Sequence, residues 1–170
     1  MHDARFDKLA EILTGYSTEL KRNEKVLIEV FDAPDEIAIA LVRAARKRGA
    51  IPFVQSQRAR ISRELALHAT QPQLNLLARH ELARMKQMDA YIAVRGSHNI
   101  TEQADVPTDK LKLVAKKMRP VQNQRVEKTK WVVLRWPTPA MAQLASMSTE
   151  AFEDFSSRFA RSITASFGRA

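Results

Sequence analysis

The spacing of apolar residues predicts that strands and helices alternate along the chain. Short apolar runs at 26–30, 51–54, 90–94 and 131–134 predict four strands. The nearly continuous run at 26–30 and the run at 131–134 are interpreted as buried, as is typical of parallel strands. Between and around these runs, apolar residues recur at three- and four-residue steps, which indicates amphipathic helices. The expected helices cover 6–20, 34–48, 60–88 in two pieces, 108–119, 139–145 and a stretch beginning at 148.

This order of elements predicts an α/β fold. Strands separated by helices pair in parallel through right-handed crossovers, which place helices on both faces of the sheet. We therefore expect a parallel sheet of about four or more strands in a three-layer, Rossmann-like arrangement.

Prolines and capping residues predict several boundaries of these elements. Pro52 must stand at the start of its strand, or the strand must lie at an edge of the sheet. Pro72 separates the two pieces of the 60–88 helix, and Thr108 is expected to cap the next helix. Pro120 is expected to end or kink that helix.

The composition excludes several classes of protein. The absence of cysteine rules out disulfides, Cys-ligated zinc, iron–sulfur clusters and thiol catalysis. The four glycines are too far apart to form a phosphate-binding loop, so the Rossmann-like pattern comes without a Gly-rich loop. No apolar run approaches the roughly 20 residues of a membrane span, and the polar start is unlike a secretory signal. These observations favour a cytoplasmic domain that has no contact with a membrane.

The net charge of +9 is unevenly distributed. Residues 107–135 hold nine basic and two acidic residues, and 156–170 hold three arginines and no acid. Such a surplus can serve nucleic-acid binding. The segment 107–135 lacks the interleaved aromatic residues of a single-strand platform, so nucleic acid is the less favoured partner. A solvated helix face or contact with an acidic partner domain explains the surplus better.

Residues that could carry chemistry are few. No two of the four histidines have the spacing that brings two imidazoles to one metal on a helix. His98 and Asn99 follow the third strand, where parallel sheets bind ligands, and could hold a polar group of a substrate. The alternative is structural, because Asn99 can equally cap or turn the chain.

The segment from Arg135 to Pro139 follows the fourth strand. Arg135 could clamp a carboxylate with paired donors, or it could pair with a nearby acid. Trp136 could line a cleft or fill a gap between layers. Thr138 is expected to cap a helix that Pro139 opens. The residues alone therefore predict an α/β domain without catalytic machinery of its own, which fits a fragment, an accessory domain or a binding module.

One stretch of the chain resembles a known family. The sequence RWPTPAMAQ at 135–143, continuing as MSTEAFEDF at 147–155, is similar to a signature of the thermophilic metalloaminopeptidases of the aminopeptidase T, aminopeptidase S and PepS type. Agreement in order extends from the leading helix through EKVLI at 24–28, GA-x-P at 49–52 and the loop with Asn99. The resemblance covers roughly residues 4–155.

The resemblance implies more than the residues show by themselves. The family removes N-terminal residues from peptides with two divalent metal ions, zinc, cobalt or similar, held by Glu, His and Asp ligands of a C-terminal half. No position here matches those ligands, so we expect neither catalytic nor metal-binding residues in this chain and no cofactor bound by it. The resemblance makes Arg135, Trp136, Thr138, His98 and Asn99 candidates for a substrate cleft or a domain interface.

The same resemblance predicts a domain organisation. Residues 1–155 correspond to the N-terminal α/β domain, which in the family packs on the catalytic domain of a homodimer. Residues 156–170 depart from the family as a basic tail rich in Ser, Arg and Phe, with apolar spacing that favours a helix extension. The catalytic domain would then be absent, through a truncated or shifted reading frame or a cut near this point. The alternatives are a stand-alone interaction or dimerisation module and, less favoured, nucleic-acid binding through 107–135.

Overall fold

Four strands form one all-parallel sheet in the order β2-β1-β3-β4. In this computed structural model, which describes residues 4–156, the strands are β1 (Lys25–Phe31), β2 (Ile51–Gln57), β3 (Ala90–Arg95) and β4 (Lys130–Arg135). The predicted α/β fold with a parallel sheet is thus confirmed.

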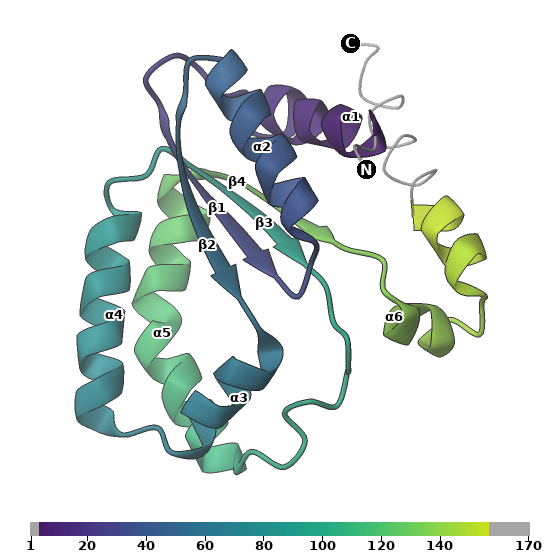
Figure 1. The fold of residues 1–170 in the computed structure, drawn as a ribbon. Coiled ribbons are helices and arrows are strands. Elements are labelled where there is room, and N and C mark those ends of the chain that lie inside the picture. The colour runs from purple at the N-terminus through teal and green to yellow at the C-terminus, as the bar shows by residue number, and fades with distance from the viewer. Residues whose placement is uncertain (1–3, 157–170) are drawn as a thin grey trace.

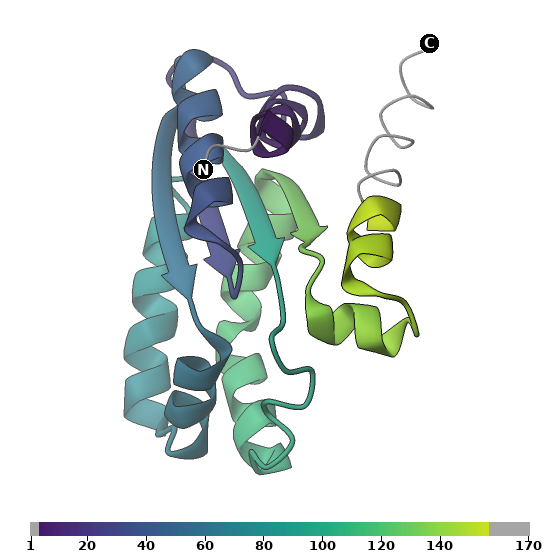
Figure 2. The same cartoon turned by 45° about the vertical axis from the view of Figure 1, so that its right-hand side comes forward.

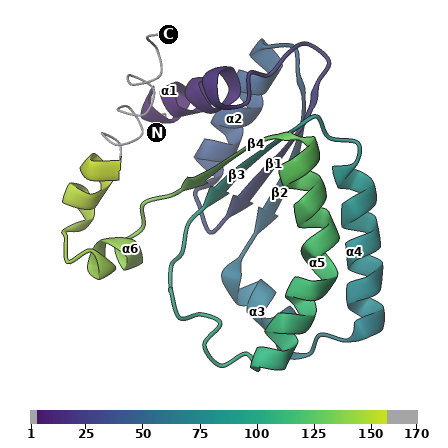
Figure 3. The same ribbon diagram turned by 180° about the vertical axis from the view of Figure 1, so that it is seen from behind.

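Helices cover both faces of the sheet (Figure 1 and, from behind, Figure 3). On one face lie α1 (Ala4–Ile12), its π-helical continuation η1 (Leu13–Ser17) and α2 (Asp35–Lys47). On the other lie α4 (Gln71–Met85) and α5 (Thr108–Lys128), with α3 (Ala59–Leu67) to the right of their lower ends in Figure 1. No helix in the described part of the chain is long and apolar enough to cross a bilayer.

Successive side chains of a strand point to opposite faces of the sheet, so the core consists of two clusters, one on each face. Even-numbered residues of β1 and β3 pack beneath α1 and α2, where Ile28, Ile37 and Ile92 are fully buried. Odd-numbered residues, including Leu27 and Tyr91, pack beneath α4 and α5. Because both central strands are covered on both faces, their sequences are nearly continuous apolar runs, interrupted in β1 by Glu29.

Pro52 lies on the outer edge of the sheet, as its missing N–H requires. The N–H of Ile51 donates to the carbonyl of Glu24 at 2.8 Å, so odd-numbered residues of β2 hydrogen-bond to β1. The neighbouring Pro52 therefore directs its nitrogen toward the free edge, where no donor is needed.

Several predicted boundaries were wrong. The cap of α5 is Pro107, Thr108 makes no capping bond, and the helix runs through Pro120 to Lys128. Pro120 is exposed, so its ring faces solvent rather than a neighbouring element. The break before α4 falls at residues 68–70, and Pro72 lies in the first turn of that helix behind the cap Thr70.

The fourth strand is also more exposed than predicted. Its residues alternate between half-buried and exposed because β4 is an edge strand, and helix α5 leaves its outer part uncovered. After it come α6 (Pro139–Leu144) and a helical stretch at 149–156, which project beside the sheet in Figure 2. The predicted tail helix falls largely on residues 157–170, outside the described residues.

Candidate functional site

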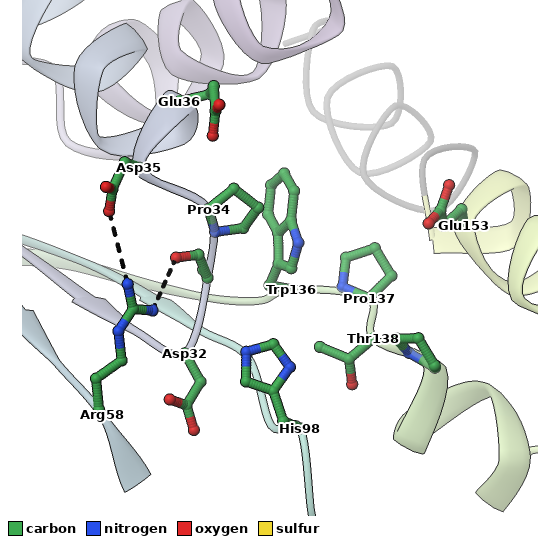
Figure 4. A pocket seen from close by; sticks show the side chains of 12 residues that line it. Asp32, Pro34, Asp35, Glu36, Arg58, His98, Trp136, Pro137, Thr138 and Glu153 are labelled. Carbon is green, nitrogen blue, oxygen red and sulfur yellow. Dashed lines mark hydrogen bonds and ion pairs between the residues drawn. The ribbon is translucent and has the colours of Figure 1, made fainter. Parts of the chain in front are cut away.

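A pocket of about 420 Å³ lies at the carboxyl ends of the strands (Figure 4). One lining residue comes from the loop after each strand: Asp32 after β1, Arg58 after β2, His98 after β3 and Trp136 after β4. Since α/β sheets bind ligands in the crevice outside these ends, the pocket is the candidate functional site. Its remaining lining comes from the start of α2, the turn before α6 and the helix at 149–156, namely Ala33, Pro34, Asp35, Glu36, Pro137, Thr138, Pro139 and Glu153.

Two backbone segments approach each other closely beside the pocket, after β1 and after β3. Gly96, directly after β3, donates its N–H to the carbonyl of Phe31 at 2.7 Å. A Cβ at Gly96 would lie 2.2 Å from the carbonyl oxygen of Asp32. Only glycine fits there, at the point where the strand order reverses between β1 and β3.

Asp32 holds the loop after β1 in place. It is buried with a left-handed φ of 45°, and its carboxylate accepts the N–H of Ala59 at 3.2 and 3.3 Å. That N–H belongs to the first turn of α3, where a carboxylate is favoured by the helix dipole. Arg58 extends across the same loop and makes contacts of 3.5 Å with the carbonyl of Ala33 and 3.8 Å with the carboxylate of Asp35.

The turn after β4 forms the opposite wall. The hydroxyl of Thr138 donates to the carbonyl of Ser97 at 2.6 Å and accepts the N–H of Met141 at 3.4 Å. It therefore caps α6, as predicted, and also binds the loop after β3. Trp136 packs edge-on against Phe6 of α1 with ring centroids 5.3 Å apart, and another part of its side chain lines the pocket.

The predicted site residues divide into two groups. His98, Trp136 and Thr138 come together at the pocket, whereas Arg135 and Asn99 do not line it. Asn99 accepts from the backbone of Thr101 at 3.1 Å and donates to Glu102 at 3.2 Å, so it serves the loop itself. Arg135 points away from Trp136, because neighbouring residues of a strand face opposite sides of the sheet.

Sequence reasoning missed the acidic part of the pocket and Arg58. Asp32, Asp35 and Glu36 surround the start of α2, and Glu153 faces them from the helix at 149–156 (Figure 4). For Asp32, Asp35 and Glu36, the available signal was their position just after the first strand, at the end of the sheet where ligands bind.

The pocket does not have the donor set of a metal centre. Among residues 4–156 no group of three or more His, Asp or Glu side chains is arranged to hold a metal ion. The buried carboxylate of Asp32 is already engaged by α3, and Asp35 contacts Arg58. The described residues can therefore contact a ligand by hydrogen bonds, charge and the indole of Trp136, but they do not fit a metal pair.

A second polar cluster lies under α5. Glu29 accepts from Gln57 at 2.9 Å and from the hydroxyl of Tyr91, and the guanidinium of Arg125 stacks 3.9 Å above the Tyr91 ring. Burial and the adjacent charge of Glu29 raise the pKa of Tyr91 to about 12. Tyr91 is therefore neutral at physiological pH and acts as a hydrogen-bond donor to Glu29.

Comparison with known proteins agrees with the fold and the sequence signature. The family model of thermophilic metalloproteases (M29) matches residues 2–165 of the chain. This chain belongs to the M29 family. The solved structure of wild-type AmpT from Thermus thermophilus superposes with a TM-score of 0.71 at 18% sequence identity. No curated protein sequence matches the chain.

The match to AmpT is unequal in length. It covers 92% of this M29 chain but only 42% of the AmpT chain. At this level of identity the likeness establishes the fold, and the chain spans less than half of its structural relative.

Proposed function

We propose that this M29 chain is the N-terminal α/β domain of a metal-dependent aminopeptidase, bounded near residue 155, and that by itself it does not hydrolyse peptides. The observation that carries the proposal is the unequal match, in which nearly all of this chain corresponds to less than half of AmpT. The lack of a metal-binding group among residues 4–156 supports it.

In this proposal the whole enzyme releases N-terminal residues from peptides as a cytoplasmic homodimer. Its pair of divalent ions would supply Lewis-acid chemistry and an activated water from residues outside this domain. The pocket at the strand ends would form part of the substrate cleft or of the interface with the catalytic half. Trp136, Thr138 and His98 would line that boundary, since all three face the same hollow.

An activity assay tests the proposal. The purified chain is incubated with aminoacyl-p-nitroanilides without metal, with cobalt and with zinc, beside an intact M29 aminopeptidase as positive control. We expect turnover only in the control. Metal-dependent turnover by this chain that a chelator abolishes would overturn the claim that it is inactive alone.

A second candidate function is that of a stand-alone interaction module. The segment after β4 exposes apolar side chains: Leu144 is 63% exposed, and Met147 and Phe155 also face solvent. Such residues on a projecting segment can serve association with a partner. Sedimentation over a range of concentrations tests this: Leu144→Ser should weaken any dimer, whereas Leu76→Ser on α4 should not. A monomer at all concentrations contradicts self-association.

A further inference from the structure

Two arginines stand side by side at the carboxyl end of the sheet, outside the pocket. Arg95 of β3 and Arg135 of β4 are register partners in neighbouring parallel strands. Arg95 lies on the α5 face, since its guanidinium is 3.8 Å from Glu29. Along β4, the even-numbered Val132 and Leu134 pack beneath α1 and α2. The odd-numbered residues, Arg135 among them, therefore face the α5 side together with Arg95. Like charges at such positions repel each other.

The surrounding residues do not neutralise this pair. The guanidinium of Arg95 lies 3.8 Å from Glu29 and also hydrogen-bonds to the side chain of Tyr91. Glu29 in turn accepts from Gln57 and Tyr91 and lies 4.0 Å from Arg125. One carboxylate therefore faces the guanidinium groups of Arg95 and Arg125. Arg135 makes no hydrogen bond or ion pair with any residue between 4 and 156.

The arginine pair is accessible and adjoins an apolar strip. The side chain of Arg95 is 39% exposed and Arg135 is exposed. Trp131 and Val133 continue the same face of β4 and are 46% and 39% exposed. Strand β4 is also an edge, so the strip borders unpaired backbone (Figure 3).

The geometry points to a carboxylate-binding site formed by Arg95 and Arg135, with Trp131 and Val133 contacting the apolar group that bears the carboxylate. A guanidinium group offers planar, paired donors that match a carboxylate, and the register of β3 and β4 places two arginines at neighbouring positions on one face. The carboxylate can be the terminus of a peptide or the side chain of Asp or Glu. This site does not rest on the proposed function, because it needs no catalytic half.

Nuclear magnetic resonance of the ¹⁵N-labelled chain tests the site with small probes. N-acetylvaline presents a terminal carboxylate, N-acetylglutamic acid α-amide presents a side-chain carboxylate, and N-acetylvalinamide presents none. We expect saturable shifts of the Trp131, Val133 and Arg135 signals with one or both carboxylates. The carboxylate probe that binds with the higher affinity identifies whether the site prefers a terminal or a side-chain carboxylate. N-acetylvalinamide should leave the signals unmoved.

Variants separate the arginines from the general positive charge of the chain. Arg135→Gln should weaken binding about fivefold, the scale of one exposed ion pair, and Arg135→Lys should retain part of the affinity. The matched control Arg79→Gln removes an exposed arginine on α4 and should change nothing. Arg135→Gln should keep the wild-type fold by circular dichroism, because the side chain has no partner there to lose.

Three results would overturn the site. The first is equal shifts with the amide, which would assign binding to the apolar strip alone. The second is an equal loss of affinity in Arg79→Gln. The third is shifts with inorganic phosphate but with neither carboxylate. Inactivity of the chain toward aminoacyl-p-nitroanilides bears only on the proposed function.

Discussion

At the scale of single residues, Gly96 and Tyr91 hold the centre of the fold by different means. Gly96 lets the backbone after β3 touch the backbone after β1, which brings the residues of the pocket together. Tyr91 is fully buried on the other face and satisfies its hydroxyl through Glu29. The role of Gly96 depends on the nearby carbonyl of Asp32, and the role of Tyr91 depends on the carboxylate of Glu29.

Gly96→Ala should destabilise the fold by about 1–3 kcal/mol, the usual scale for overpacking. The new methyl would lie 2.2 Å from a backbone oxygen, which cannot move aside as a side-chain tip can. Urea unfolding measures the loss. Ser97→Ala, in the same loop, is the control and should stay within about 0.5 kcal/mol. An unchanged midpoint for Gly96→Ala would contradict the close approach.

Tyr91 should make the fold sensitive to alkaline pH. Its pKa is about 12 in the folded protein against 10.0 unfolded, so its contribution is complete below pH 10.0 and is lost as pH rises toward about 12. The loss amounts to about 2–3 kcal/mol. Denaturant unfolding across this range should show a shallower decline for Tyr91→Phe than for the wild type. A parallel decline of the two proteins, with the exposed Tyr16→Phe as control, would argue against this role.

At the scale of elements, two helices begin in the same way but in different surroundings. Thr70 caps α4 and Thr138 caps α6, each accepting an N–H at 3.4 Å with a proline in the following turn. Thr70 is exposed, whereas Thr138 is buried and also donates to Ser97. The local sequence signal is the same, and only the tertiary contact differs.

Thr138→Ala should therefore cost more stability than Thr70→Ala. Loss of a cap alone costs about 1 kcal/mol, and loss of the buried bond to Ser97 adds about 1 kcal/mol. Chemical denaturation of both variants gives the comparison. Equal losses would mean that the bond between the loops after β3 and β4 contributes nothing measurable.

At the scale of the whole molecule, part of the basic surplus is engaged within the fold. Lys110 donates to the carbonyl of Ala69 and Lys130 pairs with Glu24 at 2.6 Å. Arg125 stacks on the ring of Tyr91. The nine basic residues of 107–135 are thus divided between internal contacts, the exposed part of α5 and the end of β4, rather than aligned as one stripe.

We therefore expect only weak binding of single-stranded DNA. Fluorescence anisotropy should show affinity at low salt that disappears by about 0.2 M, as for general phosphate attraction. Lys116→Glu with Lys117→Glu should reduce the low-salt affinity. Binding that persists at about 0.2 M salt and is lost in this variant would favour the nucleic-acid alternative over the aminopeptidase domain.

The fold could be predicted from the sequence to the extent that local chemistry dictates it. Runs such as Val26–Val30, interrupted only by Glu29, and Ala90–Val94 are apolar at nearly every position, so they indicated parallel strands. Pro120 misled the prediction because an exposed proline can be accommodated in a long helix that packs along its other side. Trp131 was correctly assigned to a strand, but its apolar neighbours suggested a buried one where the sheet has an edge.

The sequence by itself determined the alternation of elements, the signature of the M29 family and the cap at Thr138, since each depends on residues close together in the chain. Only the tertiary structure decided which side chains share a site. It joined Asp32, Arg58, His98 and Trp136 at one end of the sheet and turned Arg135 to the opposite face beside Arg95. The strand order and the alternation of side chains decide this, and both require the whole sheet to be assembled.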